Sequence, residues 1–192
     1  STTAQALAQR SLLAGNSTLL VDINLYNPSL RSLALDASPS NQPGIPQLVS
    51  APGQGLALTG VVAPVRREDI LRLRRPQALR QQIQTWHQEF DVVICDTTPF
   101  SRLNANNIPA ELVAGSCDGC LLLVLAGHTT HAMVTSAMNK LNASEAALLG
   151  CIINDRFNPP LRQELLREAN RLPQILQRPA EALRRWLRHN PL

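Results

Sequence analysis

The sequence predicts an α/β fold of three layers, with helices on both faces of a mostly parallel sheet. Two observations predict it. Four short apolar runs end in polar residues or glycine, as buried parallel strands do: residues 18–23, 90–96, 120–126 and 148–154. Helical patterns lie between and beside these runs, at residues 3–14, 68–73, 77–89, 129–141 and 161–172. Strands that alternate with single helices imply βαβ crossovers, and hence a parallel sheet.

Weaker sequence patterns predict the structure of the remaining parts of the chain. Residues 56–63 form a fifth candidate strand. Residues 36–55 predict a long surface loop, because they are rich in Ser, Pro, Gly and Gln and have no period. We expect residues 1–172 to form one domain, since a chain of this length buries enough surface without disulfides or metals. Prolines separate this domain from a C-terminal tail, residues 173–192.

Composition and charge narrow the class of protein. No apolar stretch approaches the roughly 20 residues that a membrane-spanning helix needs. The first residues carry a helical pattern rather than a signal peptide, so we expect a cytoplasmic protein. The net charge of +4 comes almost entirely from Arg, because Lys140 is the only lysine. Such a charge is compatible with nucleic acid or an anionic membrane but is common in proteins that bind neither, so nucleic acid is not the expected partner.

The four cysteines allow two interpretations. Cys117 and Cys120 have the spacing of half a zinc site, but Cys95 and Cys151 lie inside apolar runs, without a second CxxC or an HxxxH. Buried, reduced thiols are therefore the favoured interpretation.

Polar residues at the carboxyl ends of the predicted strands are the candidates for a functional site, because ligands of open α/β sheets bind there. Asp22, Asp96 and Asn154 occupy these positions. An Asp that ends an apolar strand is the Walker B arrangement, in which the carboxylate meets Mg²⁺ or its water ligands beside nucleotide phosphates. An Asp that caps the following helix would look the same, and Asn154 would look the same if it only ended a strand.

Several segments in order resemble one family. The start, Ser1-Thr2-Thr3-Ala4, followed by a small-residue helix, resembles the part of a P-loop domain that begins at the Ser/Thr of GxxxxGK[ST]. The segments DINLYNPSL, FDVVICDTTPF, CDGCLLLV and LGCIIN resemble DxDxRxPxL, YDxVIxDxPP, ADxxLLV and GxVLN of the bacterial tyrosine kinases. The chain thus resembles the MinD/ParA-type P-loop ATPases, and among them the cytoplasmic domains of bacterial tyrosine kinases and related exopolysaccharide biosynthesis ATPases.

The resemblance implies a role for each matching position. Ser1 would be the hydroxyl ligand of Mg²⁺, and Thr2 would lie next to the phosphates at a helix N-terminus, which favours anions. Asp22 and Asp96 would hold Mg²⁺ through waters, and Asn154 would face the adenine. From the residues alone, Ser1 remains equally compatible with a plain helix N-cap.

The chain also departs from the family pattern. The glycine-rich loop and its lysine are missing, so ATP and Mg²⁺ are expected cofactors only if a strand and a P-loop precede Ser1. We expect the natural protein to continue upstream in this way; a degenerate ATPase is the alternative. Asn24 replaces the second Asp of DxD and Tyr26 replaces the Arg, so weak or no hydrolysis is expected. Tyr26 is the only tyrosine, which excludes an ordinary tyrosine autokinase with a C-terminal tyrosine cluster.

The resemblance therefore implies an ATPase-like regulatory subunit of a membrane-associated assembly for exopolysaccharide synthesis or export. It would have a protein partner in that assembly, with a homodimer and a peripheral position at the inner membrane as further expectations. Two alternatives stay open. One is a non-catalytic scaffold on the same fold, and the other is a partition-type ATPase that binds DNA without sequence specificity.

The tail carries a final signal. From Pro179 the sequence predicts a short amphipathic helix with Ala180, Leu183, Trp186 and Leu187 on one side and Arg184, Arg185 and Arg188 around the rest. Such a helix suits an anionic membrane surface. At about three turns it is too short to persist alone in water, so docking on the protein or on a partner is the favoured interpretation.

Overall fold

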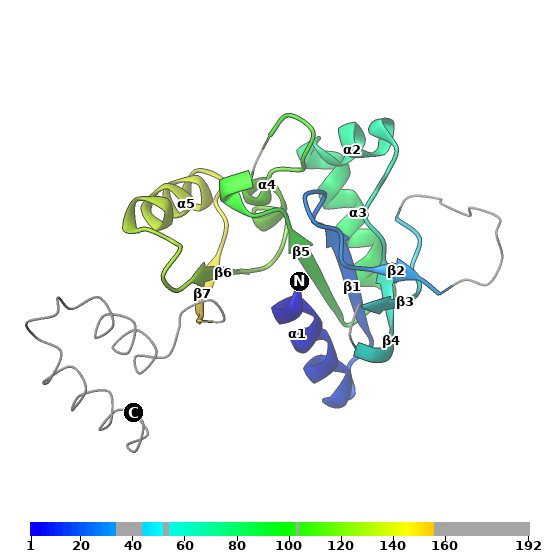
Figure 1. Ribbon diagram of the computed structural model, residues 1–192. Helices are drawn as coiled ribbons and strands as arrows, with labels where there is room; N and C mark the ends of the chain where they lie inside the picture. The colour runs from blue at the N-terminus through cyan, green and yellow to red at the C-terminus, as the bar shows by residue number, and fades with distance from the viewer. Residues whose placement is uncertain (34–43, 52–53, 103, 156–192) are drawn as a thin grey trace, which may run out of the picture. The chain divides into compact units, whose positions relative to one another are not determined.

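The computed structural model describes residues 1–33, 44–51, 54–102 and 104–155 (Figure 1). The chain divides into two compact units, which are described separately. The first comprises Ser1–Cys120 and Thr135–Leu149, and the second comprises Leu121–Val134 and Gly150–Leu192. The predicted helix at 161–172, the tail helix and the boundary at residue 172 lie outside the described residues.

A mixed five-stranded sheet forms the centre of the first unit. Its strand order is β2-β3-β4-β1-β5, with β1 at Thr18–Ile23, β2 at Arg31–Ser32, β3 at Gln47–Ala51, β4 at Gln54–Val61 and β5 at Val92–Thr97. β1 pairs in parallel with both β4 and β5, whereas β2 and β3 extend the sheet with antiparallel pairs. The parallel part is the part that the crossover argument predicts.

Helices pack on both faces of this sheet, as a three-layer fold requires. α1 (Thr2–Leu13) precedes β1, whereas α2 (Arg67–Leu73) and α3 (Pro76–Glu89) connect β4 to β5 (Figure 1). A 3₁₀ turn at Phe100–Arg102 and the short α4 (Ala110–Ala114) follow β5. Proline at the first position of α3 begins that helix, since its fixed φ suits this position and its missing N–H has no partner there.

Side-chain alternation along β1 assigns each residue to one of two hydrophobic cores. Leu19, Val21 and Ile23 pack with residues of α2, α3 and α4, including the buried Leu79 and Trp86. Leu20 faces the other way, into a core that includes Ala8 of α1 and Ile94 of β5. β1 lies between β4 and β5 in the sheet and is buried along its whole length, so it contributes to both cores.

Two further strands pair with each other in a separate sheet. These are β6 (Cys120–Leu125) and β7 (Leu148–Asn154), and α5 (His131–Ala143) connects them. The N–H of Cys120 donates to the carbonyl of Ala147, and that of Ala126 donates to Asn154, so the two strands run in the same direction. The expectation that all the predicted strands form one sheet is therefore wrong for the described residues, where β5 is an edge strand of its sheet.

The predicted loop at 36–55 is also wrong in part. Residues 47–51 form β3, in which Val49 is fully buried in the core beside α1. A strand of five residues within a segment dominated by Ser, Pro and Gln is too short to raise a periodic signal. The helix α4 was missed for the same reason, since five residues complete little more than one turn.

Gly60 in β4 offers a test of how tightly the sheet packs. A Cβ atom there would lie 2.6 Å from Val49 Cγ2 and 2.8 Å from the backbone oxygen of Leu20. We expect Gly60→Ala to lower the free energy of unfolding by about 1–3 kcal/mol, because backbone atoms cannot move aside cheaply. Gly150→Ala is the control, since Gly150 is also in a strand but nothing lies within 4 Å of the position that a Cβ atom would take there. Urea unfolding of both variants measures the difference, and equal stabilities would contradict the packing described.

Candidate functional site

Asp22 and Asp96 lie side by side at the carboxyl ends of neighbouring parallel strands. They are direct partners in the register of β1 with β5. Alternation places Asp22 on the same face as Leu20, and Asp96 on the same face as Ile94; this is the face that packs against α1. Asp22, Asp96 and Asn154 are expected to converge at one edge of the sheet near Ser1, and this is confirmed for the two carboxylates.

The first residue of the chain joins this pair. The hydroxyl of Ser1 donates a hydrogen bond of 2.6 Å to Oδ2 of Asp96. Ser1 is at the N-cap position of α1, but its side chain makes no capping hydrogen bond. Ser1 is therefore more than a plain N-cap, because its hydroxyl is directed to the strand carboxylate. Thr2 begins α1 and is exposed.

The carboxylate of Asp22 holds the loop that follows β1. Its Oδ1 accepts a 3.0 Å hydrogen bond from the N–H of Asn24. Its Oδ2 accepts from the N–H of Ser29 at 2.6 Å, from the N–H of Leu30 at 3.1 Å and from the Ser29 hydroxyl at 3.4 Å. Three donors thus crowd Oδ2, whereas Oδ1 accepts from one donor and keeps a second acceptor site. In this structure Asp22 thus shapes residues 24–30 and adds negative charge beside Asp96.

Burial raises the pKa of Asp22 above its ordinary value, and the neighbouring charge of Asp96 acts in the same direction. The backbone hydrogen bonds from Ser29, Leu30 and Asn24 lower the pKa but do not cancel the effect of burial. A cation placed beside the two carboxylates would offset the cost of keeping both charged.

Two positions that depart from the kinase pattern lie in the same loop. Asn24 is buried, and its Oδ1 accepts a 3.2 Å hydrogen bond from the N–H of Asn27. Tyr26 is half exposed, and the guanidinium carbon of Arg102 lies 5.1 Å from the centre of its ring. Arg102 ends the 3₁₀ turn after β5, so this cation–π contact joins the two loops at the carboxyl edge.

Sequence reasoning missed one polar residue near this edge. Thr98 directly follows β5 and is 1% exposed, yet its hydroxyl has no hydrogen-bond partner among the described residues. A buried hydroxyl without a partner costs about 1–3 kcal/mol. The only signal in the sequence was its place two residues after Asp96, where many strands end in polar residues without functional importance.

Asn154 ends β7, and its backbone carbonyl accepts from the N–H of Ala126. It lies in the second unit, so its predicted place opposite an adenine ring stays a prediction.

The cysteines are less buried than expected. Cys95, Cys117 and Cys120 are partly exposed and Cys151 is exposed on β7, so the expectation of buried thiols is wrong for Cys151. Alternation on a sheet turns Cys151 to the same side as the exposed Ile153. The thiols of Cys95 and Cys117 contact each other, and hydrogen bonding to Cys117, together with burial, raises the pKa of Cys95. Among the described residues, no group of His, Cys, Asp and Glu side chains is arranged to hold a metal ion.

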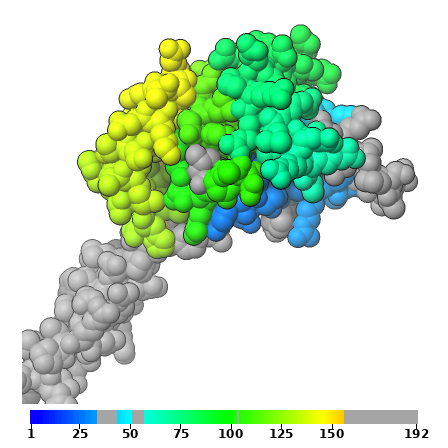
Figure 2. All heavy atoms as spheres, turned by 90° about the horizontal axis from the view of Figure 1, so that it is seen from above, coloured from blue at the N-terminus to red at the C-terminus, as the bar shows by residue number. Residues whose placement is uncertain are grey.

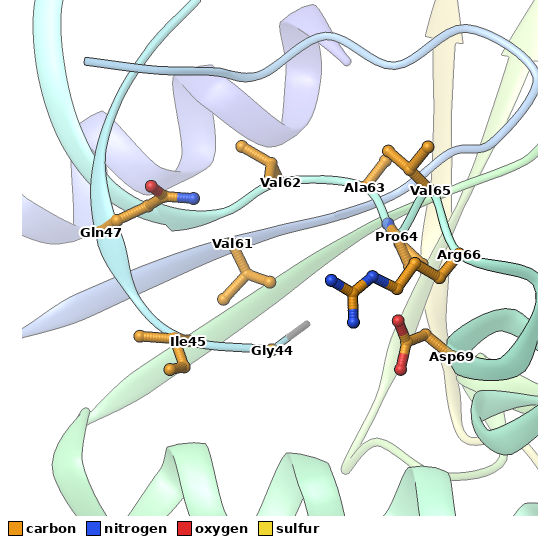
Figure 3. Close-up of a pocket in the computed structure, with 10 residues that line it drawn as sticks. All are labelled: Gly44, Ile45, Gln47, Val61, Val62, Ala63, Pro64, Val65, Arg66 and Asp69. Atoms are coloured by element: carbon orange, nitrogen blue, oxygen red, sulfur yellow. The ribbon is translucent and has the colours of Figure 1, made fainter. Parts of the chain in front are cut away.

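A shallow hollow lies at the carboxyl end of β4, apart from the carboxylate pair (Figure 3). It is open to solvent, and its lining comes from two stretches of the chain: Gly44, Ile45 and Gln47 on one, and Val61, Val62, Ala63, Pro64, Val65, Arg66 and Asp69 on the other. Figure 3 shows the side chains of Arg66 and Asp69 at one side of it and Val61 and Ile45 at the other. The hollow contains none of the predicted site residues.

The titration of Asp22 provides a test of this geometry. A carboxyl group whose pKa is raised on folding stabilises the folded protein most when the pH is below its unfolded pKa of 3.8. This contribution is lost as the pH rises through the raised pKa of the folded state. Asp22→Asn removes the titrating carboxyl group and places a side-chain amide opposite the backbone N–H donors. We therefore expect this variant to be less stable than the wild type by about 1–3 kcal/mol. The stability gap between the wild type and this variant should narrow as pH rises above 3.8.

Asp91→Asn is the matched control. Asp91 accepts hydrogen bonds from the hydroxyl and N–H of Ser17, and these lower its pKa. Its stabilising contribution is present above the unfolded value of 3.8 and is lost as pH falls. The gap for Asp91→Asn should therefore widen with rising pH. Urea unfolding across this pH range measures both gaps, and slopes of the same sign would contradict the assignment.

Sequence comparison with protein-family models and with curated proteins finds no match. Solved structures do match. The chimerical protein CapA2B2 aligns with a TM-score of 0.57 at 22% identity, over 80% of this chain and 69% of its own. The VpsO kinase domain aligns with a TM-score of 0.54 at 19% identity, over 79% of this chain and 73% of its own.

The kinase domain of the Escherichia coli tyrosine kinase ETK aligns with a TM-score of 0.56 at 17% identity, over 79% of this chain and 60% of its own. At such identities the matches establish the fold. The resemblance to bacterial tyrosine kinase domains is confirmed at that level: the chain shares the fold of these kinase domains.

Proposed function

We propose that this chain is the ATPase-like part of a regulatory subunit in a membrane-associated assembly for exopolysaccharide synthesis or export, with weak or no hydrolysis. Within it, Ser1 and Asp96 would bind Mg²⁺ and Asp22 would add charge beside them. Thr2 would lie against the nucleotide phosphates and Asn154 against the adenine. The proposal depends on residues before Ser1 that supply a strand and a GxxxxGK loop.

The observation that carries the proposal is the hydrogen bond from the Ser1 hydroxyl to Asp96, next to Asp22 in register. A hydroxyl and carboxylates are oxygen ligands of the kind that Mg²⁺ prefers. The first N–H groups of α1 have no partners within the helix and add a favourable dipole for anions. Hydroxyl, carboxylates and helix N-terminus thus meet at one edge of one sheet.

Two further observations fit a bound Mg-nucleotide. The unpartnered hydroxyl of Thr98 lies at the same strand end as Asp96 and would gain a hydrogen bond from a phosphate oxygen or an ordered water. The apolar β5 is an edge strand here, although runs such as VVIC are typical of strands that are paired on both sides. A parallel strand that paired with β5 would bring the following loop to the carboxyl edge.

When bound, Mg²⁺ would neutralise the phosphate charge. The residues of this chain would orient it: Asp96 would hold the Ser1 hydroxyl in place, and Asp22 would keep the loop 24–30 folded through its four hydrogen bonds. Asn24 is neutral and already accepts from Asn27. It supplies no second carboxylate to activate water, which is why weak or no hydrolysis is proposed.

A non-catalytic scaffold is the second candidate. The observation that favours it is that three backbone donors already occupy most of the acceptor sites of the Asp22 carboxylate, which leaves it little capacity for metal-bound waters. On this alternative the carboxyl edge would serve only to fold the loops.

The membrane-associated setting is supported by the resemblance and by the shared fold. No helix among the described residues has both the length and the apolar composition to cross a bilayer. We propose that the chain joins this assembly through a protein partner, as a homodimer or at a membrane surface. The tail helix predicted from Pro179 would take part in binding to that surface.

Calorimetric titration of the full-length protein with Mg-ATP tests the proposal. We expect micromolar binding, and Asp96→Asn should weaken it by roughly 10–100-fold, as the loss of a hydrogen bond to a charged group does. Asp91→Asn is the control, because it makes the same charge change at the opposite end of β5. If the wild type binds no Mg-ATP at millimolar concentration, the scaffold candidate replaces the ATPase-like one.

Thr98→Val separates the same two candidates. Removing an unpartnered buried hydroxyl should raise the stability of the free protein by about 1 kcal/mol, while weakening Mg-ATP binding. Thr18→Val is the matched control, because the buried hydroxyl of Thr18 donates to Ser11 Oγ at 2.8 Å and its loss should be destabilising. Unchanged affinity in Thr98→Val would exclude Thr98 from the nucleotide site.

A further inference from the structure

Among the described residues, the positive charge is concentrated in one short segment. Residues 66–80 contain six arginines and two acidic residues, an excess of four, which equals the net charge of the whole chain. This segment forms α2 and the start of α3. Elsewhere among the described residues the positive side chains are isolated from one another, so this segment is their one dense cluster of positive charge.

The arginines of α2 share its exposed face with apolar side chains. Leu73 packs into the core and Ile70 lies partly buried against it. At 100° per residue, Arg67 and Leu71 then point away from this core, with Glu68 and Arg72 next to them. Arg75 follows the end of α2, at the N-cap of α3. All five are exposed, Leu71 by 49%, and Val65 just before the helix is 78% exposed.

Only some of these arginines interact with other groups of the protein. Arg74 and Arg80 donate to the backbone carbonyls of Ala105 and Gly115. Arg66 lies 3.9 Å from Glu68, and both side chains are largely exposed, which makes a weak ion pair. Within the described ranges, no acidic side chain pairs with Arg67, Arg72 or Arg75.

We propose that the exposed surface of α2 and its two flanking residues, here called the α2 face and formed by Val65, Arg67, Leu71, Arg72 and Arg75, binds an anionic lipid surface. The turquoise atoms of α2 and α3 protrude at the surface of the first unit in Figure 2. Peptide segments bind in grooves or along strand edges. Only Val65 of this face lines the shallow hollow at the end of β4, and the three arginines and Leu71 lie outside it. A fluid bilayer fits a protruding face, because its phosphates move to the guanidinium groups and its acyl region accepts Leu71 and Val65.

This proposal extends the membrane association proposed above and does not depend on nucleotide binding. The titration with Mg-ATP and the vesicle experiment below can therefore fail separately. It also differs from the tail helix, which uses other arginines.

Co-sedimentation of the full chain with vesicles tests the proposal. Vesicles of phosphatidylcholine alone are compared with an equimolar mixture of phosphatidylcholine and phosphatidylglycerol. We expect binding to the anionic vesicles only, and a decrease in binding with added salt. The double variant Arg67→Gln/Arg75→Gln should weaken the binding about thirtyfold. Each of the two arginines contributes a roughly equal share of the lost binding free energy at an anionic surface.

The control variant is Arg10→Gln/Arg31→Gln, which removes the same charge from exposed positions on α1 and β2. It should bind almost as the wild type does. Leu71→Ser should weaken vesicle binding without changing the net charge. Equal losses in the two arginine variants, or no loss in either, would overturn the proposal. So would binding to polyglutamate or to a single-stranded oligonucleotide that depends on Arg67 and Arg75 while the vesicles are ignored.

Discussion

The parallel pairing of β1 with β5 is the constraint on which the candidate site depends. Its register sets Asp22 opposite Asp96, and alternation turns both toward α1, where the Ser1 hydroxyl meets Asp96 at 2.6 Å. A shift by one residue would turn Asp96 to the other face, among the residues that pack with Trp86. The buried run Leu19 to Ile23 prevents such a shift, because it fills both hydrophobic cores at once.

Asp22 links this register to the loop that follows it. Its carboxylate lies in a buried position, where a charge is costly, and it remains there because three backbone N–H groups and one hydroxyl donate to it. The same carboxylate raises the local negative charge beside Asp96. Burial of the Asp22 carboxylate and the hydrogen bonds that it accepts therefore act together. They determine the stability of the loop after β1 and the attraction of the carboxyl edge of the sheet for a cation.

The central strands and the convergence of Asp22 with Asp96 could be predicted, because long apolar runs and right-handed crossovers leave few arrangements. The segment 47–51 could not, since its pairing with β4 depends on contacts remote in sequence. Thr98 was also out of reach, because only the structure reveals that its hydroxyl lacks a partner. The charge of the α2 face was visible in the sequence, but its apolar members became recognisable only once Leu73 was known to be buried.

The most direct test of the central claim is the position of a bound divalent cation. In an ¹⁵N-labelled sample, Mn²⁺ replaces Mg²⁺ and broadens the amide signals close to it. The account predicts selective broadening of residues around Ser1, Asp22 and Asp96, reversed by excess Mg²⁺ and lost in Asp96→Asn. Broadening centred on exposed acidic residues such as Glu68 or Asp118, with no effect at the carboxyl edge of β1 and β5, would contradict it.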